Sequence, residues 1–323
     1  MITIGFSSHR PEVLPEAERI MTNHDVIVLE EPPDPLFEKM LRGDISIEDY
    51  VEASEYEFPE FARASCELYR RIYSQGKAVL QIDPYMEHLR NLHELFAAGG
   101  SINDLSPESP ARSVYDAEKS ATAALLSFYK VSLSGSFEDV VKSVKNFARA
   151  DARRIALRDQ MRARSLAVEA RRTLRLYIEA GYIHWTLQHY LRRLVYPRIR
   201  LRVRFLLQEQ TRCRVGTKQI FGPGDILTLI FMFHPNANNP EIDLLAARSL
   251  IYVKLLQKVE MLPRENLYPH LEDETKAYLL TRNLNFDDCE KLWRLTRFKS
   301  AEETREIVIN FIARSEATKQ SLG

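Results

Sequence analysis

Short apolar runs rich in β-branched residues alternate with helical segments along the first 85 residues. The runs ITIGF at 2–6, DVIVL at 25–29 and KAVLQIDPY at 77–85 are typical of buried strands. VLPEAERIMTN, between the first two, has helical spacing, and the helical segment before the third ends on Gly76, a natural C-cap position. This alternation predicts an α/β fold with a mainly parallel sheet flanked by helices.

Two further strand-like runs follow a long helical region. Helices are expected over residues 112–133 and again from Ser136, which suits an N-cap. The chain then returns to the sheet at LRLYIEAG, residues 174–181. In RIRLRVRFLLQ, residues 198–208, arginine alternates with apolar residues, which is the period of a strand with one polar face. We therefore expect the α/β domain to span residues 1–215.

The remainder of the chain, residues 216–323, has mostly helical spacing. Asp287 and Ser300 are N-cap candidates, and Glu303 follows Ser300 at the spacing of a capping box. The sequence thus predicts a mostly helical C-terminal subdomain.

Composition argues against several classes of protein. The 45 basic and 45 acidic residues give zero net charge, which does not favour a nucleic-acid binder. Cys66, Cys213 and Cys289 have no short spacing, so we expect neither a disulfide framework nor a thiolate metal site, and a cytoplasmic location. The longest apolar run, 226–233, is far below the roughly 18 residues of a membrane span, so no membrane partner is expected.

Polar side chains follow the predicted strands at their carboxyl ends, where parallel sheets bind ligands. A glycine at two of these joints is expected to let the strand turn sharply before a histidine. Because adjacent strand residues point to opposite faces, only one of two neighbouring glutamates should enter the pocket, and we favour the first. The candidates are Gly5 and His9 after the first strand, Glu30 and Glu31 after the second, Asp83 after the third, and Gly181 and His184 after the fourth.

Together with Arg158 and Asp159 in LRDQMRA on a long helix, these motifs follow one another in a recognisable order. The set resembles the TraB/Tiki/erythromycin esterase-like superfamily over about residues 1–210. The resemblance implies an α/β fold in which two histidines and a glutamate face one pocket. In the Tiki branch that pocket serves metal-dependent peptide hydrolysis, and in the erythromycin-esterase branch it serves ester hydrolysis with histidine as base. Phe6 departs from the pattern, because esterase-like members usually carry a glutamate there.

Two imidazoles and a carboxylate can bind a divalent cation and leave a position for an activated water. We therefore predict a metal-dependent hydrolase acting on a peptide or ester bond of a peptide or small-molecule substrate, with manganese, cobalt or zinc held by His9, Glu30 and His184. Arg158 is expected to neutralise an oxyanion or to hold the glutamate in place. Gly5, Glu31, Asp83, Asp159 and Gly181 are expected to support this site.

Two alternatives come from other functional classes. Phe6 favours a non-catalytic binding or regulatory protein of the same fold, a homo-oligomer whose C-terminal helices make the contacts. The arginine-rich region 192–214 suits a polyanion, since residues 149–218 hold eighteen basic residues against five acidic ones. In the opposing interpretation those arginines pair with the acidic segment 30–60 or with a partner subunit.

Overall fold

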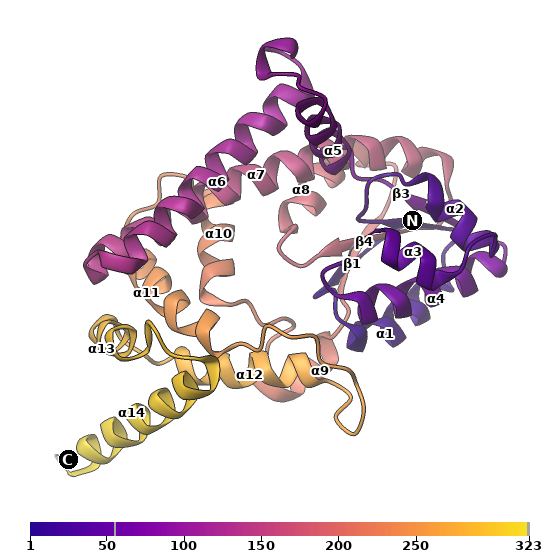
Figure 1. The fold of residues 1–323 in the computed structure, drawn as a ribbon. Coiled ribbons are helices and arrows are strands. Elements are labelled where there is room, and N and C mark those ends of the chain that lie inside the picture. Colours follow the sequence, from indigo (N-terminus) through magenta and orange to yellow (C-terminus); the bar gives the residue numbers. More distant parts are fainter. Residues whose placement is uncertain (55, 322–323) are drawn as a thin grey trace. The chain divides into compact units, whose positions relative to one another are not determined.

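The computed structural model describes residues 1–54 and 56–321, and within them five strands form an all-parallel sheet in the order β3-β2-β4-β1-β5 (Figure 1). The predicted α/β fold with a mainly parallel sheet flanked by helices is therefore confirmed. The strands are β1 (Ile2–Ser7), β2 (Val26–Leu29), β3 (Ala78–Gln81), β4 (Leu176–Gly181) and β5 (Leu201–Phe205).

Helices connect successive strands, as parallel pairing requires. Those before β4 are η1 (Pro11–Val13), α1 (Leu14–Met21), α2 (Pro35–Arg42), α3 (Ile47–Ala53), α4 (Pro59–Ser74), α5 (Pro84–Ala97), η2 (Ile102–Asp104), α6 (Pro110–Ser134) and α7 (Phe137–Arg172). Those after β4 are α8 (Trp185–Val195), α9 (Gln208–Val215), α10 (Pro223–Phe233), α11 (Pro240–Leu255), α12 (Pro269–Thr281), α13 (Phe286–Thr296) and α14 (Ala301–Ser321).

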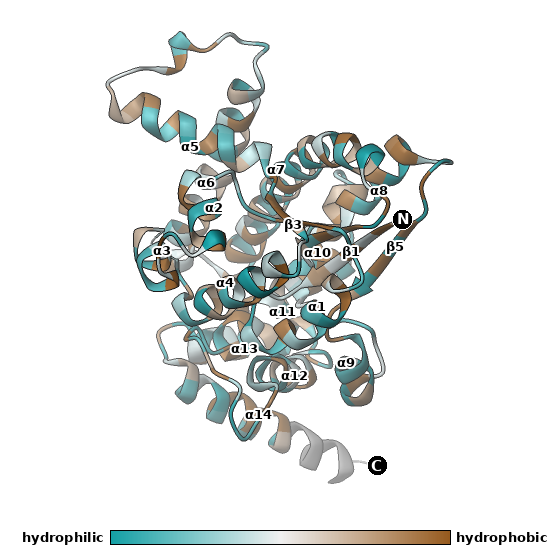
Figure 2. Ribbon diagram, turned by 90° about the vertical axis from the view of Figure 1, so that its right-hand side faces the viewer, coloured by the Kyte–Doolittle hydropathy of each residue, from teal (hydrophilic) through white to brown (hydrophobic). Residues whose placement is uncertain are grey.

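The two faces of the sheet are covered by different helices. Because crossovers between parallel strands are right-handed, the strand order implies that α1 and α4 cover one face, and α7 and α8 the other. Side-chain contacts agree, because Tyr69 of α4 reaches Glu179 of β4, whereas Trp185 of α8 lies against Phe6 of β1. Figure 2 shows the result as apolar brown along the strands and alternating teal and brown along the surrounding helices.

The chain divides into two compact units. The first comprises Met1–Lys119, Arg153–Gln210 and Leu262–Leu267, and the second comprises Ser120–Ala152, Thr211–Met261 and Tyr268–Gly323. The sheet and all predicted site residues belong to the first unit. The second unit is helical and buries its own apolar core, which includes Phe137, Phe231, Ile251 and Trp293. The main part of the second unit begins at Thr211, close to the predicted boundary at residue 215. The second unit also includes residues 120–152, which were predicted to belong to the α/β domain.

Helix starts show how far local signals specify these elements. Ser136 accepts a hydrogen bond from the Asp139 amide, and Ser300 forms the predicted reciprocal pair with Glu303, so both caps are confirmed. The prediction for Asp287 was wrong, because Asn285 caps α13 instead. No helix within the described ranges is both long enough and apolar enough to cross a membrane.

Candidate functional site

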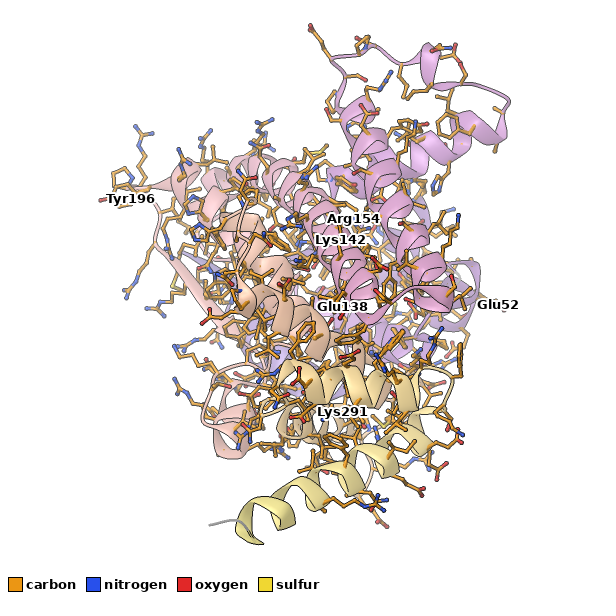
Figure 3. The ribbon with its side chains drawn as sticks, turned by 90° about the vertical axis from the view of Figure 1, so that its left-hand side faces the viewer. Glu52, Glu138, Lys142, Arg154, Tyr196 and Lys291 are labelled. Carbon is orange, nitrogen blue, oxygen red and sulfur yellow. The ribbon has the colours of Figure 1, made fainter. Side chains whose placement is uncertain are left out.

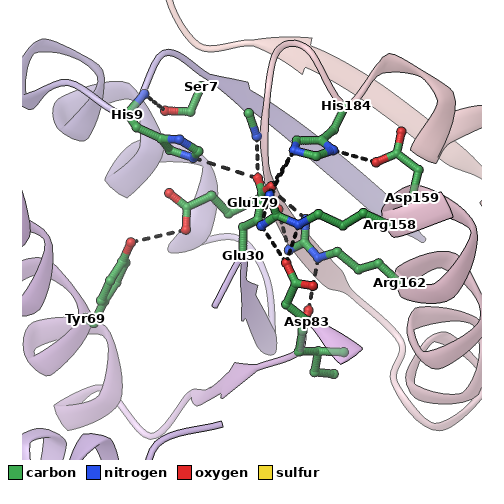
Figure 4. A network of polar contacts seen from close by, with 12 residues as sticks. Ser7, His9, Glu30, Tyr69, Asp83, Arg158, Asp159, Arg162, Glu179 and His184 are labelled. Carbon is green, nitrogen blue, oxygen red and sulfur yellow. Dashed lines mark hydrogen bonds and ion pairs between the residues drawn. The ribbon is translucent and has the colours of Figure 1, made fainter. Parts of the chain in front are cut away.

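The carboxyl ends of β2, β4 and β1 meet because these strands are neighbours in the sheet. Glu30 directly follows β2, Gly181 is the last residue of β4, and His184 is the N-cap of α8. His9 lies two residues beyond the end of β1. Figure 4 shows the side chains of His9, Glu30 and His184 converging at this edge. The structure therefore brings together residues that are up to 175 positions apart in the chain (184 − 9).

Glu30 is the centre of a cationic cluster. One carboxylate oxygen lies 2.8 Å from His184 Nε2 and 3.0 Å from Arg158 Nη2, while the other accepts the Gly181 amide and lies 3.7 Å from Arg162 Nη1. Its side chain is 5% exposed. Burial opposes ionisation, but the positive charges of His184, Arg158 and Arg162 outweigh it and hold the pKa of Glu30 well below its usual range. Glu30 is therefore a buried carboxylate at neutral pH.

His184 is held between two carboxylates. Its Nε2 faces Glu30, and its Nδ1 lies 2.6 Å from an oxygen of the buried Asp159. The Thr186 hydroxyl donates to the other oxygen of Asp159, which fixes that side chain. Burial acts against the charged imidazole, but Glu30 and Asp159 raise the pKa of His184 to about 9. At pH 7 this residue is an imidazolium that donates from both ring nitrogens.

Asp83 holds Arg158, one of the two arginines of the cluster, in place. It caps α5 by accepting the Met86 amide, and its other oxygen accepts from Arg158 Nε at 2.8 Å. Asp83 is fully buried, whereas the Arg158 side chain is 22% exposed. Arg158 is thus held in place by acidic partners.

His9 differs from His184 in exposure and in charge. Its side chain is 40% exposed, and its Nε2 lies 3.9 Å from a Glu30 oxygen, beyond hydrogen-bond range. Its backbone has a φ of +52°, uncommon for a residue with a Cβ, and its amide donates to the Ser7 hydroxyl at 2.9 Å. Desolvation lowers the pKa of His9; Glu30 opposes this, and the positive charges of His184 and Arg158 add to it. The imidazole is consequently neutral at pH 7.

Both glycines serve close packing, and neither has a positive φ. Gly5 lies inside β1, so the turn predicted at it was wrong. Gly181 ends β4, and its carbonyl accepts the His184 amide at 2.9 Å, so the chain does turn directly before this histidine. A Cβ on Gly181 would lie 3.3 Å from His9 Cε1 and 3.5 Å from His184 Cδ2. A Cβ on Gly5 would lie 2.2 Å from the Tyr177 hydroxyl oxygen, deep in the sheet. Gly181 lets the histidines approach, while Gly5 makes room for Tyr177.

A pocket of about 510 Å³ opens beside this cluster. Both Glu30 and Glu31 line it, so the expectation that only one of them could enter was wrong. The strict alternation of a strand does not apply to them, because β2 ends at Leu29. The other lining residues are His9, Phe37, Tyr56, Glu57, Phe58, Phe61, Ala62, Ser65, Cys66, Tyr69, Met86 and Glu179.

Four polar residues of the site were not predicted from the sequence. Arg162 donates to the backbone oxygens of Ile82 and Glu179, and Thr186 anchors Asp159. Glu179 accepts from the Tyr69 hydroxyl at 3.2 Å. Arg162 had a usable signal, since it follows Arg158 by four residues and so shares its helix face. Glu179 had another, as the one acid in the apolar run LYIEAG.

The predicted metal ligands are arranged as ion-pair partners. Both nitrogens of His184 face carboxylates, and Glu30 faces two guanidinium groups. A protonated imidazole has no lone pair to offer a metal, and the arginines repel a cation. Across the part of the chain that is described, no group of three or more His, Cys, Asp or Glu side chains is placed to hold a metal ion. As arranged, these residues do not fit a divalent cation, and the manganese, cobalt or zinc site stays a prediction.

Phe6 and the arginine-rich region lie apart from the pocket lining. Phe6 is buried, with its ring 5.4 Å from both Trp185 and Phe205, so it belongs to the core under α8. Arg202 and Arg204 are exposed on the edge strand β5, where charges discourage pairing with another sheet. The loop before β5 projects outward, as the position of Tyr196 in Figure 3 shows. Polyanion binding by this region stays a prediction.

Comparison with known proteins identifies a relative but no activity. No protein-family model matches the chain, and no solved structure matches it. A protein of Archaeoglobus fulgidus, described as an uncharacterized protein, is 31% identical to it over 293 residues. The match covers 90% of this chain and 97% of the archaeal protein. The chain therefore belongs to the same family as this uncharacterized protein of Archaeoglobus fulgidus.

Proposed function

We propose that the protein hydrolyses a carboxylic ester or a peptide bond in this pocket, with His9 as the general base. The observation that carries the proposal is the pair of histidines around Glu30. His184 is buried, charged and fully hydrogen-bonded, whereas His9 is partly exposed and lines the pocket with a lowered pKa. A general base must be neutral at the working pH and within reach of the substrate, and His9 meets both conditions.

In the proposed reaction, His9 Nε2 takes a proton from a water molecule, and the water oxygen attacks the carbonyl carbon. The carbonyl π bond breaks, and the electron pair moves to the carbonyl oxygen. Arg158, which lies beside Glu30 at the edge of the pocket, stabilises this oxyanion. When the carbon–heteroatom bond breaks, His9 returns its proton to the leaving alcohol or amine. Glu30, 3.9 Å from His9 Nε2, stabilises the imidazolium that forms between the two proton transfers.

The surrounding contacts support this chemistry by holding the charged groups in place before the substrate arrives. Asp83 fixes Arg158, and Asp159 with Thr186 fixes His184. Preorganised charges stabilise a developing oxyanion without reorganising during the reaction. The resemblance implies a histidine-based and a metal-dependent mechanism. The carboxylate of Glu30 is already paired with His184 and two arginines, which favours the histidine-based mechanism.

The test compares wild type with His9→Gln on p-nitrophenyl esters of increasing acyl length and on a set of short peptides. We expect kcat/KM of the variant to fall by about 10²–10⁴-fold, the usual contribution of a general base. His189→Gln is the matched control, because His189 is exposed on α8 and outside the pocket lining. Urea unfolding should give the same midpoint for all three proteins. Full activity in His9→Gln would contradict the proposal, and absence of turnover in wild type would favour the binding protein instead.

The pH dependence of kcat/KM provides a second check. Activity requires neutral His9, so the acid limb should lie below pH 6.5 because the pKa of His9 is lowered from that value. It also requires charged His184, so the alkaline limb should lie near pH 9. A profile that rises steadily through pH 10 would exclude a role for the His184 imidazolium.

A further inference from the structure

We propose that the pocket binds its ligand through a protonated amine carried on an apolar body, with Glu31 and Glu179 as the acceptors of that amine. That the substrate carries such an amine rests on the proposed hydrolytic function. That the pocket binds an amine of this kind rests on the pocket alone. It goes beyond the reaction because neither carboxyl group takes part in the chemistry proposed for His9.

The first observation is that these two carboxyl groups have only neutral partners. Glu31 accepts from the Gln81 amide at 2.8 Å and lies 3.5 Å from the Tyr56 hydroxyl. Glu179 accepts from the Tyr69 hydroxyl at 3.2 Å. Among the residues that the structure describes, no ion pair joins either carboxyl group to a lysine, arginine or histidine. The cations of the site are instead gathered around Glu30.

A buried carboxyl group without a cationic partner is costly to ionise. Burial together with the charges of Glu31 and Glu30 raises the pKa of Glu179 to about 8. Both groups line the pocket, so an ammonium bound there would favour loss of their protons to solvent and would pair with the resulting carboxylates. An anionic ligand would meet the opposite field. The wall formed by Glu31 and Glu179 thus favours a cation.

The second observation is a buried polar atom with no partner. Ser65 lines the same pocket and is 4% exposed, and its hydroxyl oxygen has no hydrogen-bond partner. Buried hydroxyl groups are normally hydrogen-bonded, so an isolated one in a pocket wall indicates a group supplied by the ligand. The N–H groups of an ammonium can donate to this oxygen as well as to the carboxyl groups.

The third observation concerns the body of the ligand. Aromatic rings make up much of the remaining wall, and a volume of about 510 Å³ suits a small organic molecule. Aromatic faces attract ammonium groups and bury apolar carbon. One ring already has a cation, since the Arg10 guanidinium lies 4.1 Å from the Phe58 ring centre. The rings that line the pocket are Phe37, Tyr56, Phe58, Phe61 and Tyr69.

The experiment measures binding with two probes that differ in charge but hardly in shape, 4-phenylbutylamine and 4-phenylbutan-1-ol. Isothermal titration calorimetry at pH 7 gives the dissociation constant of each for the wild-type protein. We expect the amine to bind at least about tenfold more tightly than the alcohol. Equal affinity, or tighter binding of the alcohol, would overturn the proposal. This comparison needs no variant, so it holds even if a substitution in the pocket prevents folding.

The variants Glu31→Gln and Glu179→Gln then identify the acceptors. Each should weaken amine binding by about tenfold and leave alcohol binding unchanged, because glutamine keeps the shape but cannot ionise to pair with the ammonium. Glu52→Gln is the matched control, since Glu52 is an exposed glutamate on α3 (Figure 3) and does not line the pocket. Unchanged amine affinity in both pocket variants would overturn the assignment of the acceptors.

This test is separable from that of the hydrolytic function. Selective amine binding without turnover of any ester or peptide would contradict the hydrolase and leave the ammonium site standing. Hydrolysis that depends on His9, with no preference between amine and alcohol, would do the reverse. Charge selectivity should also appear in catalysis, as a lower KM for esters that bear an amine than for their neutral counterparts.

Discussion

Glu30 and Glu31 are neighbours in sequence and line the same pocket, yet their carboxyl groups have opposite surroundings. Glu30 is approached by His184, Arg158 and Arg162, whereas Glu31 meets only an amide and a phenol. Burial acts on both in the same direction. The pKa of Glu30 nevertheless falls well below its usual range, and that of Glu31 rises. The neighbouring cations, and not the depth of burial, therefore decide which of the two carboxyl groups is charged.

The two histidines repeat this contrast. Burial acts to lower the pKa of both histidines, but the carboxylates on both ring nitrogens of His184 outweigh it and raise the pKa of that residue. His9 has only one distant carboxylate, so desolvation lowers its pKa, and the nearby cations add to this. One strand-end cluster therefore provides a fixed positive charge and a neutral base side by side. Titratable groups whose pKa values are driven apart in this way are typical of acid–base catalysis.

The largest effect should come from removing a buried cation from the Glu30 cluster. Arg162→Met leaves Glu30 short of one positive charge and the backbone oxygens of Ile82 and Glu179 without their donor. We expect the free energy of unfolding to fall by about 3–5 kcal/mol. Urea denaturation measures it, with Glu31→Gln as the control that should change it by about 1 kcal/mol or less. Equal losses of unfolding free energy in Arg162→Met and Glu31→Gln would contradict the proposed difference between Glu30 and Glu31.

A smaller effect separates the two strand-end glycines. Gly5→Ala should lower the free energy of unfolding by about 1–3 kcal/mol, because its Cβ collides with the buried Tyr177 hydroxyl. Gly181→Ala should lower the free energy of unfolding by only about 1 kcal/mol or less. It should reduce kcat/KM by about tenfold, since His9 must shift by a few tenths of an ångström. Denaturation and ester hydrolysis on both variants check the pair, and a swap of the two effects would contradict the site geometry.

A further effect changes gradually with pH and concerns Glu179. Its pKa is raised from 4.5 to about 8, so the unfolded chain ionises this group in a pH range where the folded chain keeps it protonated. Stability linked to Glu179 is therefore lost as pH rises from about 4.5 to 8. Glu179→Gln should gain stability over wild type across this range, by about 1 kcal/mol per pH unit and roughly 3–4 kcal/mol between pH 5 and pH 8. Subtracting the unfolding free energy of wild type from that of the variant at each pH cancels the contributions of the other titrating groups. Parallel denaturation curves at both pH values would show that Glu179 ionises normally.

The sequence predicted the sheet because strand and helix periods are local properties. Neighbouring apolar runs such as DVIVL are recognisable without tertiary information, and so are the caps at Ser136 and Ser300. The meeting of His9, Glu30 and His184 followed from strand-end placement in a parallel sheet. Arg158 was expected as a partner of Glu30, but Arg162, which reaches Glu30 from the same helix, was not. Metal ligation was predicted from residue types alone, without knowledge of these cations.

The pocket wall escaped prediction for a different reason. Tyr56, Ser65 and Tyr69 come from the loop and helix between β2 and β3, which carry no motif. The side chains of Tyr56 and Tyr69 meet Glu31 and Glu179 only once the crossover packs against the sheet. The sequence could place Glu30 and Glu31 after a strand end, but it could not show that Glu31 would have only neutral partners.

The most direct test of this account is an NMR titration of the imidazole resonances of His9 and His184 from pH 4 to pH 10, assigned with His9→Gln. The account predicts that His9 titrates below pH 6.5 and that His184 remains charged until about pH 9. Both histidines titrating together near pH 6.5 would contradict it, because the cluster around Glu30 would then set neither charge.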